Sequence, residues 1–203
     1  VIDIEGRVVA LNAGGSTGAA SSFYLPLARV KRALELIRAG KPVTRGTLQV
    51  VFAYTPYDEL ERLGLRPETQ AEARSAAKQL TGMLVVQEVQ PGSPTEGALQ
   101  PGDILVRANG HLVTTFDPLA ELLDDSVGRT IEVEVERGGE RIVRSLEVQD
   151  LHAITPAEYL EFGDAVVHAL SYQMARHLNM PVRGVYVANP GYALGAAGVP
   201  RGA

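Results

Sequence analysis

The sequence predicts a mixed α/β fold in which strands predominate. Short apolar runs bounded by Gly, Pro or Asn, such as Met83–Val89 and Ile104–Ala108, are typical of strands. Between residues 131 and 136, Ile and Val alternate with Glu, which predicts a strand with apolar side chains on its buried face and glutamates in solvent. Helical spacing of apolar residues is rarer and first occurs within Val30–Ile37.

Composition excludes several classes of protein. The chain has 203 residues, 45% of them apolar, so it can bury a core. No apolar run approaches the roughly 18 residues that a membrane-spanning helix needs. The net charge is −5 with no basic block, which argues against nucleic acid as a partner. The absence of cysteine excludes disulfides, thiolate metal sites and a cysteine nucleophile.

The first forty residues predict a hairpin followed by a helix. Ile4–Val8 predicts a turn between two apolar runs, with Gly6 supplying a positive φ. Small residues then predict a loop over Asn12–Ser22. The helical pattern begins after Phe23–Pro26, and Gly40 is a typical residue to end it.

The middle of the chain predicts a strand, two helices and two further strands. A short apolar strand is expected over Thr47–Ala53. Two helical segments follow, Asp58–Leu63 and Glu68–Leu80, and the second is rich in Ala, Glu, Gln and Arg. We expect the second of these helices, with Gln79 near its end, to be a solvated cover and not a site. The strands Met83–Val89 and Ile104–Ala108 come next.

A hairpin, a helix and a strand pair complete this region. Asn109-Gly110 is the strongest two-residue hairpin signal. Asp117-Pro118 predicts a helix start with Asp as N-cap and Pro at the first helical position. Leu119 and Leu123 share one face of that helix, which should end near Gly128. Two glycines then turn the alternating strand back on itself.

Three motifs in this region point to one family. Gly82–Val85 reads G-M-L-V, Gly92–Pro94 reads G-S-P, and Ala98–Ile104 reads A-L-Q-P-G-D-I. Together they resemble a PDZ domain of the HtrA/DegP-like serine proteases. The segments Asp150–Pro156 and Ser171–Arg176 are particularly similar to the long fungal HtrA-like proteases.

The resemblance implies a domain organisation. Residues 1–42 are similar to the C-terminal end of a trypsin-like protease domain, with Phe23–Pro26 in the place of its closing F-A-I-P segment. Residues 43–150 would be a PDZ sandwich of strands with two or more helices. Residues 151–203 would be a linker and the truncated start of a second PDZ domain, because Gly184–Val187 echoes the G-x-L-V motif.

The resemblance also implies a peptide-binding site. A PDZ domain adds an extended peptide to a strand edge beside a helix and holds its carboxylate in a turn of N–H groups. The residues implied here are Gly46, Thr47, Leu48, Gln49, Val50, Leu119 and Leu123. Thr47 stands where the family has Tyr and Gln49 where it has Gly, so a reshaped turn is expected. The alternative that these leucines are core residues and the groove is closed stays open.

The expected partners are peptides or unfolded protein segments, with or without a free C-terminus, and the intact parent is expected to be a homo-oligomer. The triad of such a protease would lie upstream of Val1, so no catalytic residue, metal or cofactor is assigned to this chain. The leading function is recognition for a serine endopeptidase of protein quality control. The alternatives are a PDZ scaffold on an inactive protease homologue and a C-terminal processing protease. A periplasmic or nuclear compartment stays open.

Two other patterns point to no site. Ala13–Gly18 is rich in Gly but lacks the Gly-Lys-Ser/Thr ending of a phosphate loop. His152 near Asp150, and His168 four residues after Asp164, could be drawn as metal or catalytic clusters. Since no third ligand has suitable spacing, we interpret them as surface pairs.

Overall fold

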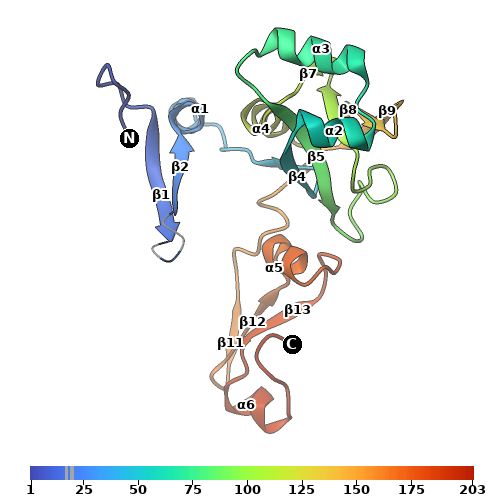
Figure 1. Cartoon of the computed structure of the whole chain (residues 1–203). Helices are drawn as coiled ribbons and strands as arrows, with labels where there is room; N and C mark the ends of the chain where they lie inside the picture. The colour runs from blue at the N-terminus through green and yellow to red at the C-terminus, as the bar shows by residue number, and fades with distance from the viewer. Residues whose placement is uncertain (17, 19–20) are drawn as a thin grey trace. The chain divides into compact units, whose positions relative to one another are not determined.

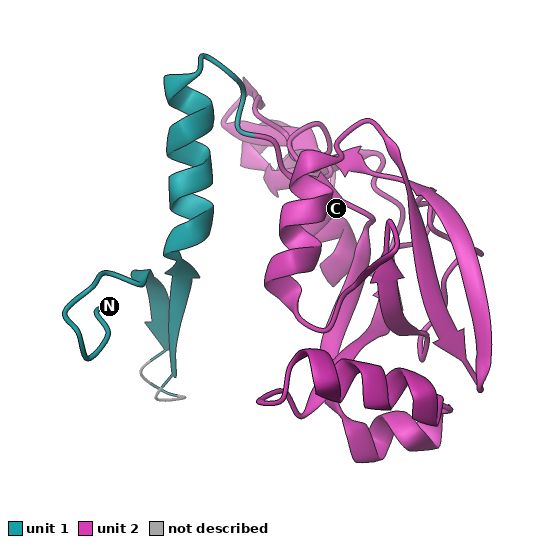
Figure 2. Ribbon diagram, turned by 90° about the horizontal axis from the view of Figure 1, so that it is seen from above, with its two compact units in different colours: residues 1–43 teal, residues 44–203 magenta. Residues whose placement is uncertain are grey.

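The computed structural model describes all residues except 17, 19 and 20 (Figure 1). The chain divides into two compact units, Val1–Val43 and Thr44–Ala203, which are coloured separately in Figure 2. More residues lie in strands than in helices, so the predicted mixed, mainly β fold is confirmed.

The first unit is a hairpin followed by a helix. Strands β1 (Ala10–Ser16) and β2 (Ser21–Pro26) pair antiparallel, and α1 (Leu27–Arg38) continues directly from β2. The strands extend into the loop predicted over Asn12–Ser22, so the connection is shorter than expected, and its residues 17, 19 and 20 lie outside the described part. Gly40 follows the helix with a φ of 65°, as predicted.

The second unit is built on a six-stranded antiparallel sheet with the order β4-β5-β6-β8-β9, in which β7 also pairs with β6. Its strands are β4 (Val50–Pro56), β5 (Gly82–Val89), β6 (Ile104–Ala108), β7 (His111–Leu112), β8 (Thr130–Arg137) and β9 (Glu140–Glu147). Asn109 and Gly110 have φ values of 48° and 77°, which confirms the predicted two-residue hairpin between β6 and β7. Two short strands, β3 (Gly46–Thr47) and β10 (Gln149–Asp150), form a separate two-stranded antiparallel sheet.

The predicted strand Thr47–Ala53 is interrupted in the structure. Leu48 and Gln49 separate β3 from β4, and Gln49 has a left-handed φ of 55°. A residue in this conformation cannot continue a strand, which the apolar pattern alone does not indicate.

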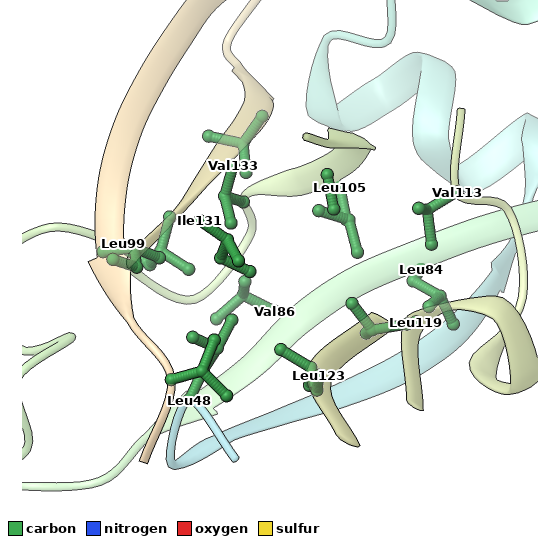
Figure 3. Close-up of a cluster of buried hydrophobic side chains, with 14 residues drawn as sticks. Leu48, Leu84, Val86, Leu99, Leu105, Val113, Leu119, Leu123, Ile131 and Val133 are labelled. Atoms are coloured by element: carbon green, nitrogen blue, oxygen red, sulfur yellow. The ribbon is translucent and has the colours of Figure 1, made fainter. Parts of the chain in front are cut away.

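Helix α4 (Phe116–Asp125) covers one face of the sheet. Its leucines Leu119 and Leu123 join Leu84 and Val86 of β5 in the main core cluster (Figure 3). The helix begins at Phe116, two residues before the predicted first helical position at Pro118, so Asp117 lies in its first turn and the N-cap is Thr115.

Helices α2 (Tyr57–Leu63) and α3 (Pro67–Ala76) belong to a second core cluster. The alternate residues of β5, Met83 and Val85, join it. Because neighbouring side chains of a strand point to opposite faces, β5 is buried on both. The predicted helices are therefore confirmed, although α3 ends at Ala76, earlier than expected. The expectation that α3 is a solvated cover is wrong, because its Thr69 and Ala73 are buried and Ala73 lies in this second core.

The prediction that the glutamates of β8 lie in solvent is wrong for two of them. Glu134 and Glu136 were expected in solvent, yet they are 7% and 1% exposed. Glu136 accepts a hydrogen bond from the Arg66 N–H at 2.8 Å and another from the Thr69 hydroxyl. A buried carboxylate needs such donors, and the α2–α3 segment supplies them.

The Asp of the Pro101-Gly102-Asp103 motif has a structural role. Asp103 is fully buried, and its oxygens accept bonds from Arg137 Nε at 2.6 Å and Nη2 at 2.8 Å. This bidentate pair raises the pKa of Arg137 and joins the start of β6 to the end of β8.

The C-terminal part of the second unit has a three-stranded antiparallel sheet, β11-β12-β13. Its elements are β11 (Leu160–Phe162), β12 (Ala165–Ala169), α5 (Tyr172–His177), β13 (Val185–Asn189) and α6 (Gly191–Ala196). Ser171 caps α5 by accepting the Met174 N–H at 3.1 Å. Within the described residues no helix is long and apolar enough to cross a membrane.

Truncation of a core side chain tests this packing. Leu105 is fully buried in the main cluster, so Leu105→Ala should lower the free energy of unfolding by about 2–5 kcal/mol. Val143, on β9, is 42% exposed, and Val143→Ala should change it by less than about 0.5 kcal/mol. Urea denaturation measures both, and equal changes would contradict the assigned core.

Candidate functional site

Strand β4 stands at the end of the six-stranded sheet. One of its edges pairs with β5, and among the described residues no strand pairs with the other. Val50 and Phe52 of β4 pack against the main cluster. Helix α4 contributes Leu119 and Leu123 to that cluster (Figure 3). The unpaired edge of β4 therefore belongs to a strand whose side chains Val50 and Phe52 pack in the same core as the leucines of α4.

The structure brings the predicted apolar residues of the site together. Leu48, Leu119 and Leu123 are 3%, 4% and 8% exposed and lie in one cluster, with half-buried Val50 packed against it. They pack on one another, so a ligand side chain that enters between β4 and α4 has to part them.

The predicted carboxylate turn, Gly46–Gln49, is occupied by the protein's own groups. The Gly46 N–H donates to Asp124 Oδ1 at 2.9 Å, and the Gln49 N–H donates to Thr47 Oγ1 at 2.9 Å. Thr47, Leu48 and Gln49 are each no more than 9% exposed. Two N–H groups of the turn, those of Gly46 and Gln49, are thus paired internally.

Gly46 is required by the close approach of α4. A Cβ at this position would lie 2.0 Å from the Leu123 carbonyl oxygen, so no other residue fits. Gln49 takes up the left-handed conformation for which the family's Gly is suited. Its side-chain Nε2 donates to Gln149 Oε1, which ties the turn to β10.

Asp124 is the residue of this site that sequence analysis missed. Besides the Gly46 N–H, its carboxylate contacts Arg45 Nη1 at 3.3 Å, and its carbonyl accepts the Thr44 hydroxyl at 2.7 Å. An acidic residue in the last turn of a helix opposes the helix dipole. That unfavourable position was the available signal that Asp124 has a specific partner.

The other candidate clusters have structural roles. Asp150 Oδ1 accepts the His152 N–H at 2.9 Å within a turn, and His168 lies against the Tyr186 ring at 5.3 Å. Within the described residues no three acidic, His or Cys side chains are placed to hold a metal. The Ala13–Gly18 loop falls partly outside the described part of the chain.

Comparison with known proteins finds two family matches. Residues 85–137 match a PDZ domain, and residues 153–202 match a PDZ-like domain. Sequence similarity to curated proteins extends over nearly the whole chain. Protease Do-like 7 of Arabidopsis thaliana is 51% identical over 99% of this chain and 19% of its own length. The pro-apoptotic serine protease NMA111 of Ajellomyces capsulatus is 50% identical over 92% of this chain and 18% of its own length.

The chain therefore spans about a fifth of the length of these relatives. Among solved structures, the HtrA-type protease AlgW with decapeptide aligns with a TM-score of 0.48 and 20% identity. That alignment covers 71% of this chain and 42% of the other.

Substitution of Asp124 tests the tie between α4 and the turn. Asp124→Ala leaves the Gly46 N–H without its acceptor and should lower the free energy of unfolding by about 1–3 kcal/mol. Asp124→Asn keeps an oxygen acceptor and should cost less. Glu121→Ala, on an exposed position of the same helix, is the control for urea denaturation. If all three variants unfold alike, Asp124 does not hold the turn.

Proposed function

The chain carries two PDZ-type segments and is homologous to Do-like serine proteases, and from this premise we propose that it recognises substrates for an endopeptidase. In this proposal residues 43–150 bind extended peptides or unfolded protein segments. Residues 1–42 close the protease domain, and residues 151–203 begin a second PDZ domain. The intact protein cleaves the bound substrate and forms a homo-oligomer.

The unpaired edge of β4 is the observation that carries the proposal. An extended segment that adds to this edge gains backbone hydrogen bonds worth about 1 kcal/mol each. One apolar side chain inserted beside Leu119 and Leu123 adds about 1.5–3 kcal/mol. Several bonds and one such side chain correspond to a dissociation constant in the micromolar range.

The state of the turn favours internal segments over free C-termini. A carboxylate needs N–H donors, and those of Gly46 and Gln49 are already bonded. Strand addition to β4 needs neither of them. In our proposal the site therefore binds unfolded segments wherever they occur along a substrate chain.

Peptide binding tests the recognition role. A short fluorescent peptide in which Val alternates with Thr and Lys, with an amidated C-terminus, should bind with micromolar affinity. Binding should slow amide hydrogen exchange in Val50–Pro56 and leave the other sheet edge, Glu140–Glu147, unchanged. The same peptide N-methylated at alternate residues is the control and should not bind. Equal binding of both peptides would contradict strand addition.

Cleavage tests the enzymatic role of the intact protein. A chain extended upstream through the protease domain should hydrolyse casein, and substitution of its nucleophilic Ser by Ala should abolish the activity. Equal rates with and without the Ser would instead support a PDZ scaffold on an inactive homologue.

A further inference from the structure

Strand β12 is the counterpart, in the second PDZ-type segment, of β4 in the first. Each pairs antiparallel with the next long strand of its segment, β4 with β5 and β12 with β13. The strands β5 and β13 come at matching motifs, G-M-L-V at Gly82–Val85 and G-V-Y-V at Gly184–Val187. A Pro-Gly pair follows both, Pro91-Gly92 and Pro190-Gly191. The edge of β12 that faces away from β13 is therefore equivalent to the edge of β4 on which we propose strand addition.

The chain itself occupies this outer edge of β12. Strand β11 pairs antiparallel with it in the register Leu160–Val167, Glu161–Val166 and Phe162–Ala165, so β12 is the middle strand of its sheet (Figure 1). On β4 no strand takes the equivalent edge within the described residues. The chain before β4 pairs with β10 as β3, whereas the chain before β12 folds back onto β12.

A two-residue turn directs β11 onto β12. Gly163 and Asp164 have φ values of 51° and 58°, and two successive left-handed residues are what a type I′ hairpin turn requires. Residues of β13 and α6 fix both carbonyls of the turn. The Gly163 carbonyl accepts the Tyr192 N–H at 3.2 Å, and the Asp164 carbonyl accepts Asn189 Nδ2 at 2.9 Å. The hairpin is thus tied to the rest of its sheet.

Backbone pairing and this turn hold β11, and burial does not. Leu160 and Phe162 are 60% and 41% exposed, and neither of the two core clusters contains a residue of β11. A strand that replaced β11 would restore its backbone bonds without opening a core. A segment joined through a short turn has, however, an effective concentration of about millimolar or more. A free peptide at micromolar concentration therefore does not displace it.

We propose that β11 is an autoinhibitory strand that closes the outer edge of β12 to strand addition. Peptides then bind at β4 and not at the second PDZ-type segment, and release of β11 opens the second edge. The inference rests on the proposed strand addition and adds to it which of two equivalent edges accepts a peptide.

Substitutions in the turn test the closure without any peptide. Proline cannot adopt the φ of Asp164, so Asp164→Pro should release β11, whereas Asp164→Gly keeps the turn and is the matched control. Phe162 and Ala165 flank the turn as its hydrogen-bonded pair, so the Val167 N–H, two residues on, faces Leu160. By NMR, this N–H should exchange about tenfold faster or more in Asp164→Pro and at the wild-type rate in Asp164→Gly. Equal exchange in all three chains would overturn the inference.

A second variant separates release of β11 from unfolding of the sheet. Phe162→Pro leaves the turn residues unchanged and removes an N–H that pairs with β12. In both Pro variants the amides of Val185–Asn189 should exchange as in the wild type, because β13 pairs with the other edge of β12. If both variants accelerate β13 together with Val167, β11 is an integral strand of the sheet and the proposal is wrong.

Peptide binding then shows which edge is open. The probe is the amidated peptide of Val, Thr and Lys described above. In the wild-type chain it should slow exchange in Val50–Pro56 and leave Val167 unchanged, whereas in Asp164→Pro it should slow both. With β4 protected, slowing of Val167 in the wild type, or its absence in Asp164→Pro, would contradict the closure. Without protection of β4 the proposed function fails, and the exchange of Val167 without peptide decides the closure alone.

Discussion

The close approach of α4 to the backbone at Gly46 is the constraint on which the site depends. No Cβ fits between Gly46 and the Leu123 carbonyl, and Asp124 accepts the Gly46 N–H at 2.9 Å. These two contacts place the end of the helix at the start of the turn that leads into β4. The unpaired edge of β4 is consequently held beside the apolar face of α4.

The two-sided burial of β5 keeps that edge in place. Leu84 and Val86 belong to one core and Met83 and Val85 to the other, so β5 is packed on both faces. β4 pairs with β5 along its whole length and therefore adjoins a well-packed strand. Helices α2 and α3 contribute to this arrangement indirectly, because they cover the face of β5 that carries Met83 and Val85.

Local features of this fold were predictable from the sequence, whereas distant contacts were not. The Asn109-Gly110 hairpin and the helix ending before Gly40 follow from the conformations of adjacent residues. Burial of Glu136 depends on donors at Arg66 and Thr69, about seventy positions away, which periodicity cannot indicate. The leucines proposed for the site do lie in one cluster. The hydrogen bonds of the Gly46 and Gln49 N–H groups to Asp124 and Thr47 could be found only in the structure.

Strand addition to β4 is the central claim, and interstrand nuclear Overhauser effects test it most directly. An isotope-labelled amidated peptide bound to the chain should show backbone contacts to Val50–Pro56 in a regular ladder. Side-chain contacts to Leu119 or Leu123 should accompany them. Contacts confined to Glu140–Glu147, or to the cavity of about 520 Å³ that Gln49 lines, would contradict the account.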